Sequence, residues 1–412
     1  MEEERKESKA EKSLWRPGVD RMEEGEQLDY DPSTYITYHD ISMEWPCLSI
    51  DVIRDPLGIH RTKFPMELFL VAGSQAAQAS QNKVYLMKVS NIQKTYDENE
   101  MEEEDPEEPE YEQPNVDVKS FKHDGGINRI RVMPQAANII ATMSDTKNVH
   151  LWDTQNLLTA LDFSSSAAHP ASSKPLHTFS GHSTEGFALD WSPTVPGRLL
   201  TGDCSKYVYL WEKRESGWVI DKTPYNGHTD SVEDIQWSPV EKDVFATCSV
   251  DKTVRIWDTR RRKSSMLFVA AHQMDVNVIS WNTNKPHLML SGSDDGSFKV
   301  WDLRKFKSSL PSGHFTYHRG PITSIQWHPT EEAMLAVASA DNQLSIWDLA
   351  LEDEVDSKSI GANANVSEIP PQLLFVHQGQ QNVKELRFHP QIPGVIISTA
   401  QSGLNIFKPC NL

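Results

Sequence analysis

Residues 227–258 read GHTDSVEDIQWSPVEKDVFATCSVDKTVRIWD. A Gly-His pair opens this stretch and a Trp-Asp pair closes it. Apolar residues alternate with polar ones over residues 232–237, 244–247 and 253–257. Alternation at period two is typical of half-buried strands. The stretch therefore predicts three short strands joined by turns.

The same marks recur along the chain. In five copies a histidine precedes a tryptophan by 29 residues, and the pairs are His123 and Trp152, His182 and Trp211, His228 and Trp257, His272 and Trp301, and His318 and Trp347. A sixth, degenerate copy runs from His377 to Phe407, and residues 46–53, 67–73 and 83–89 predict a further unit without the tryptophan. Repeats of about 40–45 residues with these marks are typical of four-stranded β-propeller blades.

On these marks the chain resembles the WD-repeat family. The resemblance implies an all-β fold, a seven-bladed WD-repeat β-propeller over residues 34–412. Few residues follow Phe407, so we expect residues 34–38 to supply the outer strand of the last blade and to close the ring. Residues 1–33 are polar and contain Pro17, Gly18 and Pro32, which predicts a flexible N-terminal arm.

In the WD-repeat family, a buried chain of hydrogen bonds joins a tryptophan, a hydroxyl residue, a histidine and an aspartate within a blade. Two sets fit this pattern in full: His228, Thr247, Asp251 and Trp257, and His272, Ser291, Asp295 and Trp301. Such structural tetrads explain these residues without a catalytic triad. The remaining repeats deviate, with Val337 at the hydroxyl position before Trp347, and with Thr146 and Ser205 at the aspartate position before Trp152 and Trp211. We expect these three blades to depend more on packing.

Composition narrows the classes of function. The 412 residues carry a formal net charge of −19 at pH 7, so the chain suits a basic partner and is not expected to bind nucleic acid strongly by itself. The four cysteines have no metal-binding spacing, and no phosphate loop or nucleophile motif is present, which predicts a non-enzymatic protein without metal or cofactor. No apolar run is long enough to cross a membrane, and the first residues lack a signal-peptide core, so we expect a soluble intracellular protein.

Three segments interrupt the repeats. Residues 97–112 carry eleven acids and no basic residue, which predicts a disordered loop that either offers negative charge to a basic client or only favours solubility; its densest part is Glu102, Glu103, Glu104, Asp105, Glu107 and Glu108. Residues 351–371 form a second acidic loop, with Glu352, Asp353, Glu354 and Asp356 followed by Pro370 and Pro371. Residues 154–177 are expected to form a further loop.

A partner surface is expected where the loops that carry the histidines meet at one end of the axis. Side chains three and five residues after the histidine should emerge there, and Asp294 should join them. The predicted partner-binding residues on this face are Glu185, Phe187, Glu233, Asp275 and Asp294. Further partner-binding residues are predicted in the second acidic loop, namely Glu352, Asp353, Glu354, Asp356, Pro370 and Pro371. The carboxylates of Glu185, Glu233, Asp275 and Asp294 would form an acidic mouth that attracts a basic chain. The alternative is that they are ordinary surface acids.

Two narrower resemblances concern function. Glu44, Trp45 and Pro46, together with the acidic loop that ends in Pro370 and Pro371, resemble the histone-binding WD-repeat branch. The glutamate-rich loop, together with residues 185–193, 198–203, 231–239, 275–281 and 373–379, resembles the glutamate-rich WD-repeat family of nucleolar ribosome-assembly factors.

The second resemblance implies a non-enzymatic chaperone or assembly factor that binds a newly made, basic large-subunit ribosomal protein and supports ribosome biogenesis. It also implies pre-ribosomal particles as partners, and a place in the nucleolus and nucleus with some protein in the cytoplasm. One alternative is a histone-binding chromatin scaffold or histone chaperone with core histones as partners. Another is a substrate receptor of a cullin-type ubiquitin ligase, because WDxR boxes end at Arg260 and Arg304; these arginines also suit local pairing.

Overall fold

Seven antiparallel sheets of four strands each follow one another in the computed structural model. The structure describes residues 30–95, 113–162, 174–261, 264–351 and 370–412. Residues 1–29 of the predicted N-terminal arm, the loop over residues 97–112 and residues 352–369 of the second acidic loop therefore lie outside the described residues. Pro32–Leu412 form one compact unit, which contains all seven sheets.

Each sheet is one blade. The strands of each blade are given from the innermost outward. The first blade is β2 (Cys47–Ile53), β3 (Met66–Ser74), β4 (Lys83–Ile92) and β5 (Asn115–Lys122), and the second is β6 (Ile127–Met133), β7 (Ala136–Ser144), β8 (Val149–Asp153) and β9 (His177–Phe179). The third is β10 (Ala188–Trp191), β11 (Arg198–Gly202), β12 (Val208–Arg214) and β13 (Gly217–Ile220). The next three are β14 (Val232–Trp237), β15 (Val244–Ser249), β16 (Thr253–Asp258) and β17 (Leu267–Ala270); β18 (Val276–Trp281), β19 (Leu288–Ser293), β20 (Phe298–Asp302) and β21 (Gly313–Phe315); and β22 (Ile322–Trp327), β23 (Met334–Ser339), β24 (Leu344–Asp348) and β25 (Leu373–His377). The seventh is β26 (Glu385–Phe388), β27 (Ile396–Thr399), β28 (Gly403–Pro409) and β1 (Tyr35–Ser42).

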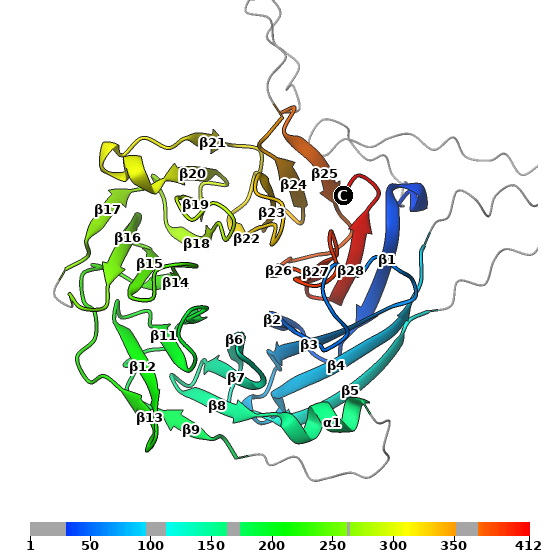
Figure 1. Ribbon diagram of the computed structural model, residues 1–412, viewed down its shortest axis with the longest axis horizontal. Helices are drawn as coiled ribbons and strands as arrows, with labels where there is room; N and C mark the ends of the chain where they lie inside the picture. Colours follow the sequence, from blue (N-terminus) through cyan, green and yellow to red (C-terminus); the bar gives the residue numbers. More distant parts are fainter. Residues whose placement is uncertain (1–29, 96–112, 163–173, 262–263, 352–369) are drawn as a thin grey trace, which may run out of the picture. The chain divides into compact units, whose positions relative to one another are not determined.

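The N-terminal strand closes the ring, as the sequence predicts. Strand β1 pairs antiparallel with β28, and Tyr38 stands opposite Phe407 and Ile41 opposite Leu404. The innermost strands contact one another in order, and β26 of the last blade contacts β2 of the first. Figure 1 shows this order around the axis, with the two ends of the colour scale side by side at β1 and β28. The predicted seven-bladed, all-β propeller is confirmed.

The hydrophobic core lies between neighbouring blades. Among the described residues, each buried cluster combines side chains of two adjacent blades, as when Phe69 and Val84 of the first blade pack with Ile130 and Trp152 of the second. Burial of this apolar surface stabilises each junction between blades. Each blade is therefore held in place by its two neighbours.

The expectation of a simple loop over residues 154–177 is wrong for its first part, which forms helix α1 (Gln155–Asp162). Asp153 accepts the backbone N–H of Gln155, the first residue of the helix, at 3.0 Å, which satisfies one of the free N–H groups at the helix start. Leu157 and Leu161 lie four residues apart on one face and are buried between the first and second blades. The sequence does not predict this helix, because a helix of two turns needs only a few apolar residues to pack against the blades, and the segment as a whole has the composition of a loop.

Short 3-10 helices occupy Pro32–Thr34, Ala79–Gln81 and Leu303–Ser308. Over the described part of the chain, no helix combines the length and the apolar character that crossing a membrane requires. The same residues contain no group of histidine, cysteine, aspartate and glutamate side chains that could hold a metal ion.

Candidate partner-binding site

A chain of hydrogen bonds holds the fourth blade from within. Trp257 donates its indole N–H to Thr247 Oγ1 at 2.8 Å, and His228 Nε2 lies 2.6 Å from the same hydroxyl. His228 Nδ1 lies 2.8 Å from Asp251 Oδ2. Burial lowers the pKa of His228, and a neutral ring with its proton on Nδ1 satisfies every partner in this chain.

The fifth blade contains the same chain, with a second hydroxyl between the histidine and the aspartate. Ser291 links Trp301 and His272 at 2.9 and 2.8 Å. His272 Nδ1 lies 3.1 Å from Ser297 Oγ, and Ser297 donates to Asp295 at 2.6 Å. Asp295 therefore acts on the imidazole partly through Ser297.

In two of the blades expected to lack part of the chain, the chain is complete. In the sixth blade Ser345 replaces the missing hydroxyl of Val337, its cross-strand partner, and lies 2.7 Å from both Trp347 Nε1 and His318 Nε2. In the third blade the aspartate is Asp203, two residues before Ser205, and its Oδ2 lies 2.9 Å from His182 Nδ1. The expectation that these two blades lack part of the chain, and so depend more on packing, is therefore wrong.

The second blade lacks the aspartate. His123 Nδ1 lies 3.0 Å from the carbonyl oxygen of Gly125, while Nε2 contacts Thr142 Oγ1 at 2.9 Å. Burial lowers the pKa of His123 to about 4, so the ring is neutral and donates to the carbonyl. These histidine, serine and threonine side chains are committed to holding the blades.

The predicted acidic residues gather at one end of the axis. The inner strands run in the same direction, so the loops that precede them share one face, and all four carboxylates there are half-buried. Burial raises the pKa of Glu233, and Asp275 and Asp294 raise it further. Burial and then Asp294 raise the pKa of Asp275. These shifts show that the charges of neighbouring blades act on one another; the acidic mouth is hereafter the group Glu185, Glu233, Asp275 and Asp294.

Two amides orient the acidic mouth. Asn128 donates to Glu185 Oε2 at 2.9 Å, and Asn277 donates to Asp294 Oδ1 at 2.7 Å. The positively charged Arg129 lowers the pKa of Glu233 and donates to the backbone carbonyl of Phe187. Phe187, a predicted partner-binding side chain, is half-buried. Arg129 is a residue of this face that spacing from the histidines does not reveal.

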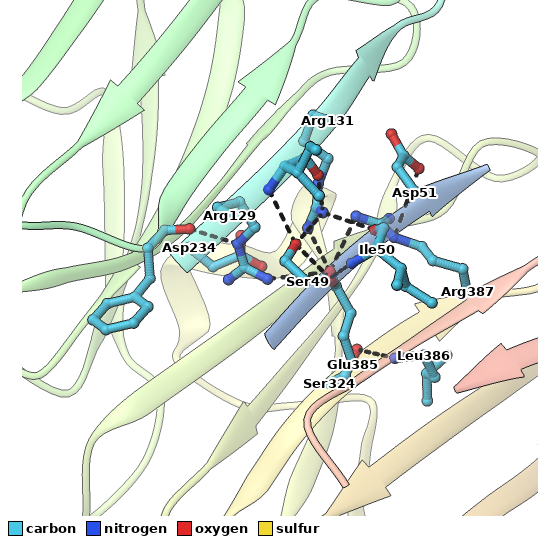
Figure 2. Close-up of polar contacts among 12 residues, drawn as sticks. Ser49, Ile50, Asp51, Arg129, Arg131, Asp234, Ser324, Glu385, Leu386 and Arg387 are labelled. Carbon is cyan, nitrogen blue, oxygen red and sulfur yellow. Dashed lines mark hydrogen bonds and ion pairs between the residues drawn. The ribbon is translucent and has the colours of Figure 1, made fainter. Parts of the chain in front are cut away.

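A buried ion-pair cluster lies on the axis (Figure 2). Glu385 Oε1 accepts from Arg131 at 2.6 Å, Arg129 at 3.2 Å and Arg387 at 3.3 Å. Glu385 Oε2 accepts from the hydroxyl of Ser49 at 2.7 Å and from the backbone N–H of Ile50 at 2.9 Å. Burial alone would raise the pKa of Glu385, but the three guanidinium groups outweigh it and hold the pKa well below its usual range. One carboxylate thus joins the seventh, first and second blades.

Other polar side chains of the inner strands connect successive blades in the same way. Each accepts the backbone N–H of the next inner strand: Asp51 from Val132 at 2.8 Å, Asp190 from Trp237 at 2.8 Å, Asp234 from Ile279 at 3.1 Å, Gln236 from Trp281 at 2.7 Å, Ser280 from Trp327 at 3.1 Å, and Gln326 from Phe388 at 2.7 Å. Burial raises the pKa of Asp190 to about 7. The polar residues of the axis therefore fix the spacing of the blades around the acidic mouth.

Comparison with known proteins agrees with this architecture. The family model described as WD domain, G-beta repeat matches residues 173–212, 220–258, 263–302 and 309–348. The chain is 49% identical to Glutamate-rich WD repeat-containing protein 1 of Dictyostelium discoideum over 98% of this chain and 86% of that protein. The chain belongs to the glutamate-rich WD-repeat family. The resemblance found in the sequence is thereby confirmed.

Two further relatives of this glutamate-rich WD-repeat protein are similar over nearly the whole chain. Ribosome assembly protein rrb1 of Schizosaccharomyces pombe is 43% identical over 99% of this chain and 86% of its own length. Protein HEAT STRESS TOLERANT DWD 1 of Arabidopsis thaliana is 46% identical over 97% of this chain and 92% of its own length. A family model for the histone-binding protein RBBP4 matches residues 25–93, which include the Glu44-Trp45-Pro46 motif.

Several predicted residues of this family member lie outside the described residues: Glu102, Glu103, Glu104, Asp105, Glu107, Glu108, Glu352, Asp353, Glu354 and Asp356. Pro370 and Pro371 are described, and Leu373 donates its backbone N–H to Pro370 at 2.9 Å, so the two prolines form the turn that leads into β25. Glu44 pairs with Lys83 at 2.7 Å.

The two WDxR arginines are paired within their own boxes. Arg260 makes a two-pronged contact with Asp258, at 2.9 and 2.6 Å, and Arg304 makes the same contact with Asp302. Both arginine side chains remain largely exposed. The structure therefore contains the local ion pairs that were expected as the alternative role of these two arginines.

Proposed function

We propose that this protein is a ribosome-assembly factor that binds a newly made, basic protein of the large ribosomal subunit and shields its charge until assembly. The observation that carries the proposal is the acidic mouth, four half-buried carboxylates from neighbouring blades, in which Asp275 and Asp294 act on Glu233 and Asp294 acts on Asp275. The name of the Schizosaccharomyces pombe relative, a ribosome assembly protein, supports the same process.

The physical logic follows from charge. A ribosomal protein without its RNA exposes clustered lysine and arginine side chains, which bind nucleic acid without sequence preference. Burial and neighbouring carboxylates raise the pKa of Glu233 and of Asp275, so a guanidinium or ammonium group that enters the mouth stabilises their charged forms. A net charge of −19 also steers a basic client toward the protein. The proposed role needs no catalysis, and it places the protein in the nucleolus and nucleus with a cytoplasmic fraction, together with pre-ribosomal particles.

Affinity purification of the tagged full-length protein identifies the client class. We expect one stoichiometric large-subunit ribosomal protein that is rich in lysine and arginine. Recovery of a histone pair or of a ligase adaptor instead, without any ribosomal protein, would contradict the proposal.

A neutralised mouth tests the site. The variant Glu185→Gln, Glu233→Gln, Asp275→Asn and Asp294→Asn should weaken binding of the purified client by at least about tenfold, since a charge-assisted contact contributes about 1.5–3 kcal/mol. Client binding by this variant should also depend less steeply on salt. The matched control neutralises four exposed acids elsewhere, Asp117, Glu215, Glu241 and Glu331. Equal losses in the two variants would show that only overall charge matters.

Histone binding is the second candidate, because a histone-binding family model matches residues 25–93. If this function is present, deletion of residues 1–29 should reduce binding of a purified histone pair while binding of the ribosomal protein by the mouth persists. Unchanged histone binding by the deletion variant would argue against a histone site that uses residues 1–29.

A further inference from the structure

A second opening lies at the end of the axis opposite the acidic mouth. It follows the C-terminal ends of the inner strands and forms a cavity of about 420 Å³, within the size range of ligand pockets. A collar of prolines surrounds it, contributed by different blades: Pro134, Pro193, Pro239, Pro329 and Pro390. Pro134, Pro193 and Arg54 are exposed, so the cavity opens to solvent. Edges of buried tryptophans, including Trp191 and Trp237, line its wall.

The acceptor groups that face this cavity are already engaged. Asp51 accepts the backbone N–H groups of Val52 and Val132 at 3.0 and 2.8 Å. Asp190 accepts the backbone N–H of Trp237, and burial raises its pKa to about 7. The cavity therefore has little capacity left for a cationic guest.

The cations that face the cavity are less well compensated. Arg387 shares Glu385 Oε1 with two closer-packed arginines, and its Nε lies 3.9 Å from Asp51 and has no hydrogen-bond partner. Burial and the neighbouring Arg131 lower the pKa of Arg387, whereas that of Arg131 is raised. Arg54 lines the same cavity and makes no hydrogen bond or ion pair with any described residue.

We propose that this cavity binds a carboxylate side chain of an acidic peptide segment from a partner protein, with Arg387 at the floor and Arg54 at the rim. Guanidinium groups match the planar geometry of a carboxylate. The proline collar and the tryptophan edges offer apolar contact to the peptide on either side of the charged group, which a free small anion would not use. The site is independent of the proposed function, because it uses the other axial face and the opposite charge.

The test uses the full-length protein and an acetylated, amidated tetraglutamate peptide, with tetraglutamine as the uncharged probe. Tryptophan fluorescence and isothermal titration calorimetry report binding, since tryptophan edges line the cavity. We expect saturable binding of one tetraglutamate per chain and no binding of tetraglutamine. Arg54→Gln should weaken tetraglutamate binding about tenfold or more, as should Arg387→Gln. Arg214→Gln, an exposed arginine of β12, is the matched control and should bind as the wild type does.

Arg54 is a surface residue, so its variant keeps the test decisive if Arg387→Gln fails to fold. Equal affinity of the wild type and Arg54→Gln for tetraglutamate would overturn the proposal. Equal binding of tetraglutamine would overturn it as well, because the apolar collar alone would then suffice. Saturable binding of inorganic phosphate or acetate without binding of tetraglutamate would refute the assignment to a peptide.

Discussion

Ser345 receives the indole N–H of Trp347 at 2.7 Å, although it lies on the same strand only two residues earlier. In the fourth and fifth blades the corresponding hydroxyl, Thr247 or Ser291, lies on the neighbouring strand. Ser345 stands opposite Val337, so its side chain reaches the same buried position from the other strand. The sixth blade thus preserves the hydrogen bond by exchanging the strand that supplies it.

Removing this hydroxyl should destabilise the protein. Ser345→Ala leaves the N–H of Trp347 and the Nε2 of His318 without a partner, and each buried unsatisfied group costs about 1–3 kcal/mol. We expect the thermal midpoint to fall by a few degrees in differential scanning calorimetry. Adding Val337→Thr to Ser345→Ala should restore most of the loss, because a hydroxyl returns to the position that Thr247 occupies in the fourth blade. A single variant as stable as the wild type would show that this bond contributes nothing.

Much of this blade chemistry can be predicted by counting residues, and some cannot. The histidine, the tryptophan and most hydroxyls follow fixed spacings, because each blade repeats the same strand lengths. The role of Ser345 could not be predicted from residue spacing, because it depends on which residues of two neighbouring strands lie opposite each other. The role of Asp203 could not be predicted for a similar reason, since a turn can present an aspartate two residues earlier without changing the strands.

The ion-pair cluster around Glu385 could not be predicted from the sequence. Glu385 and Arg131 are separated by 254 residues and meet only because the ring closes. Neither residue belongs to the repeating sequence motif, and a polar residue on an inner strand can have many roles, so the sequence does not single them out. The same is true of Arg129, which lies beside the acidic mouth.

Loss of the Glu385 charge should be costly at neutral pH. Glu385→Gln leaves three buried guanidinium groups without their common partner, and breaking a buried pair costs about 3–5 kcal/mol. The pKa of Glu385 is lowered in the folded protein, so its contribution is present above the pKa of the unfolded chain and is lost as the pH falls below about 4. The difference in denaturant midpoint between wild type and variant should therefore be large at pH 7 and should shrink in acid. A difference that stays constant with pH would contradict this account.

Asp190 should show the opposite dependence on pH. Burial raises its folded pKa to about 7 from an ordinary value of 3.8, so the folded state binds more protons between these values and loses stability as the pH rises through them. Asp190→Asn keeps an acceptor for the N–H of Trp237 and removes the charge. We expect the variant to be more stable than the wild type at pH 8 and nearly equal to it at pH 4.

Thermal melts across this pH range check the prediction for Asp190. Asp117→Asn on the exposed face of β5 is the control and should follow the wild type. A variant that is less stable than the wild type at pH 8 would show that the charged carboxylate stabilises the folded protein at this position.

Removal of β1 should open the ring. Deleting residues 1–42 leaves the outer edge of β28 unpaired, although β28 still pairs with β27, and it removes the buried Tyr35 and Ile41. We expect the melting midpoint to drop by more than about 10 °C, or the protein to aggregate through the exposed strand edge. Deleting residues 1–29 alone retains β1 and is the control. If the two truncated proteins melt together, closure by β1 is unimportant for stability.

The pairing of β1 with β28 also sets an order in time. Synthesis produces β1 before any other strand of the ring and reaches β28 after all the rest, so β1 has no native partner while the chain grows. Contacts between residues so far apart in the chain form slowly, and unpaired strands are prone to aggregation in the meantime. The proposed chaperone of a nascent client must therefore itself be translated through β28 before its seventh blade can form. Only then is the arrangement of residues around the axis complete.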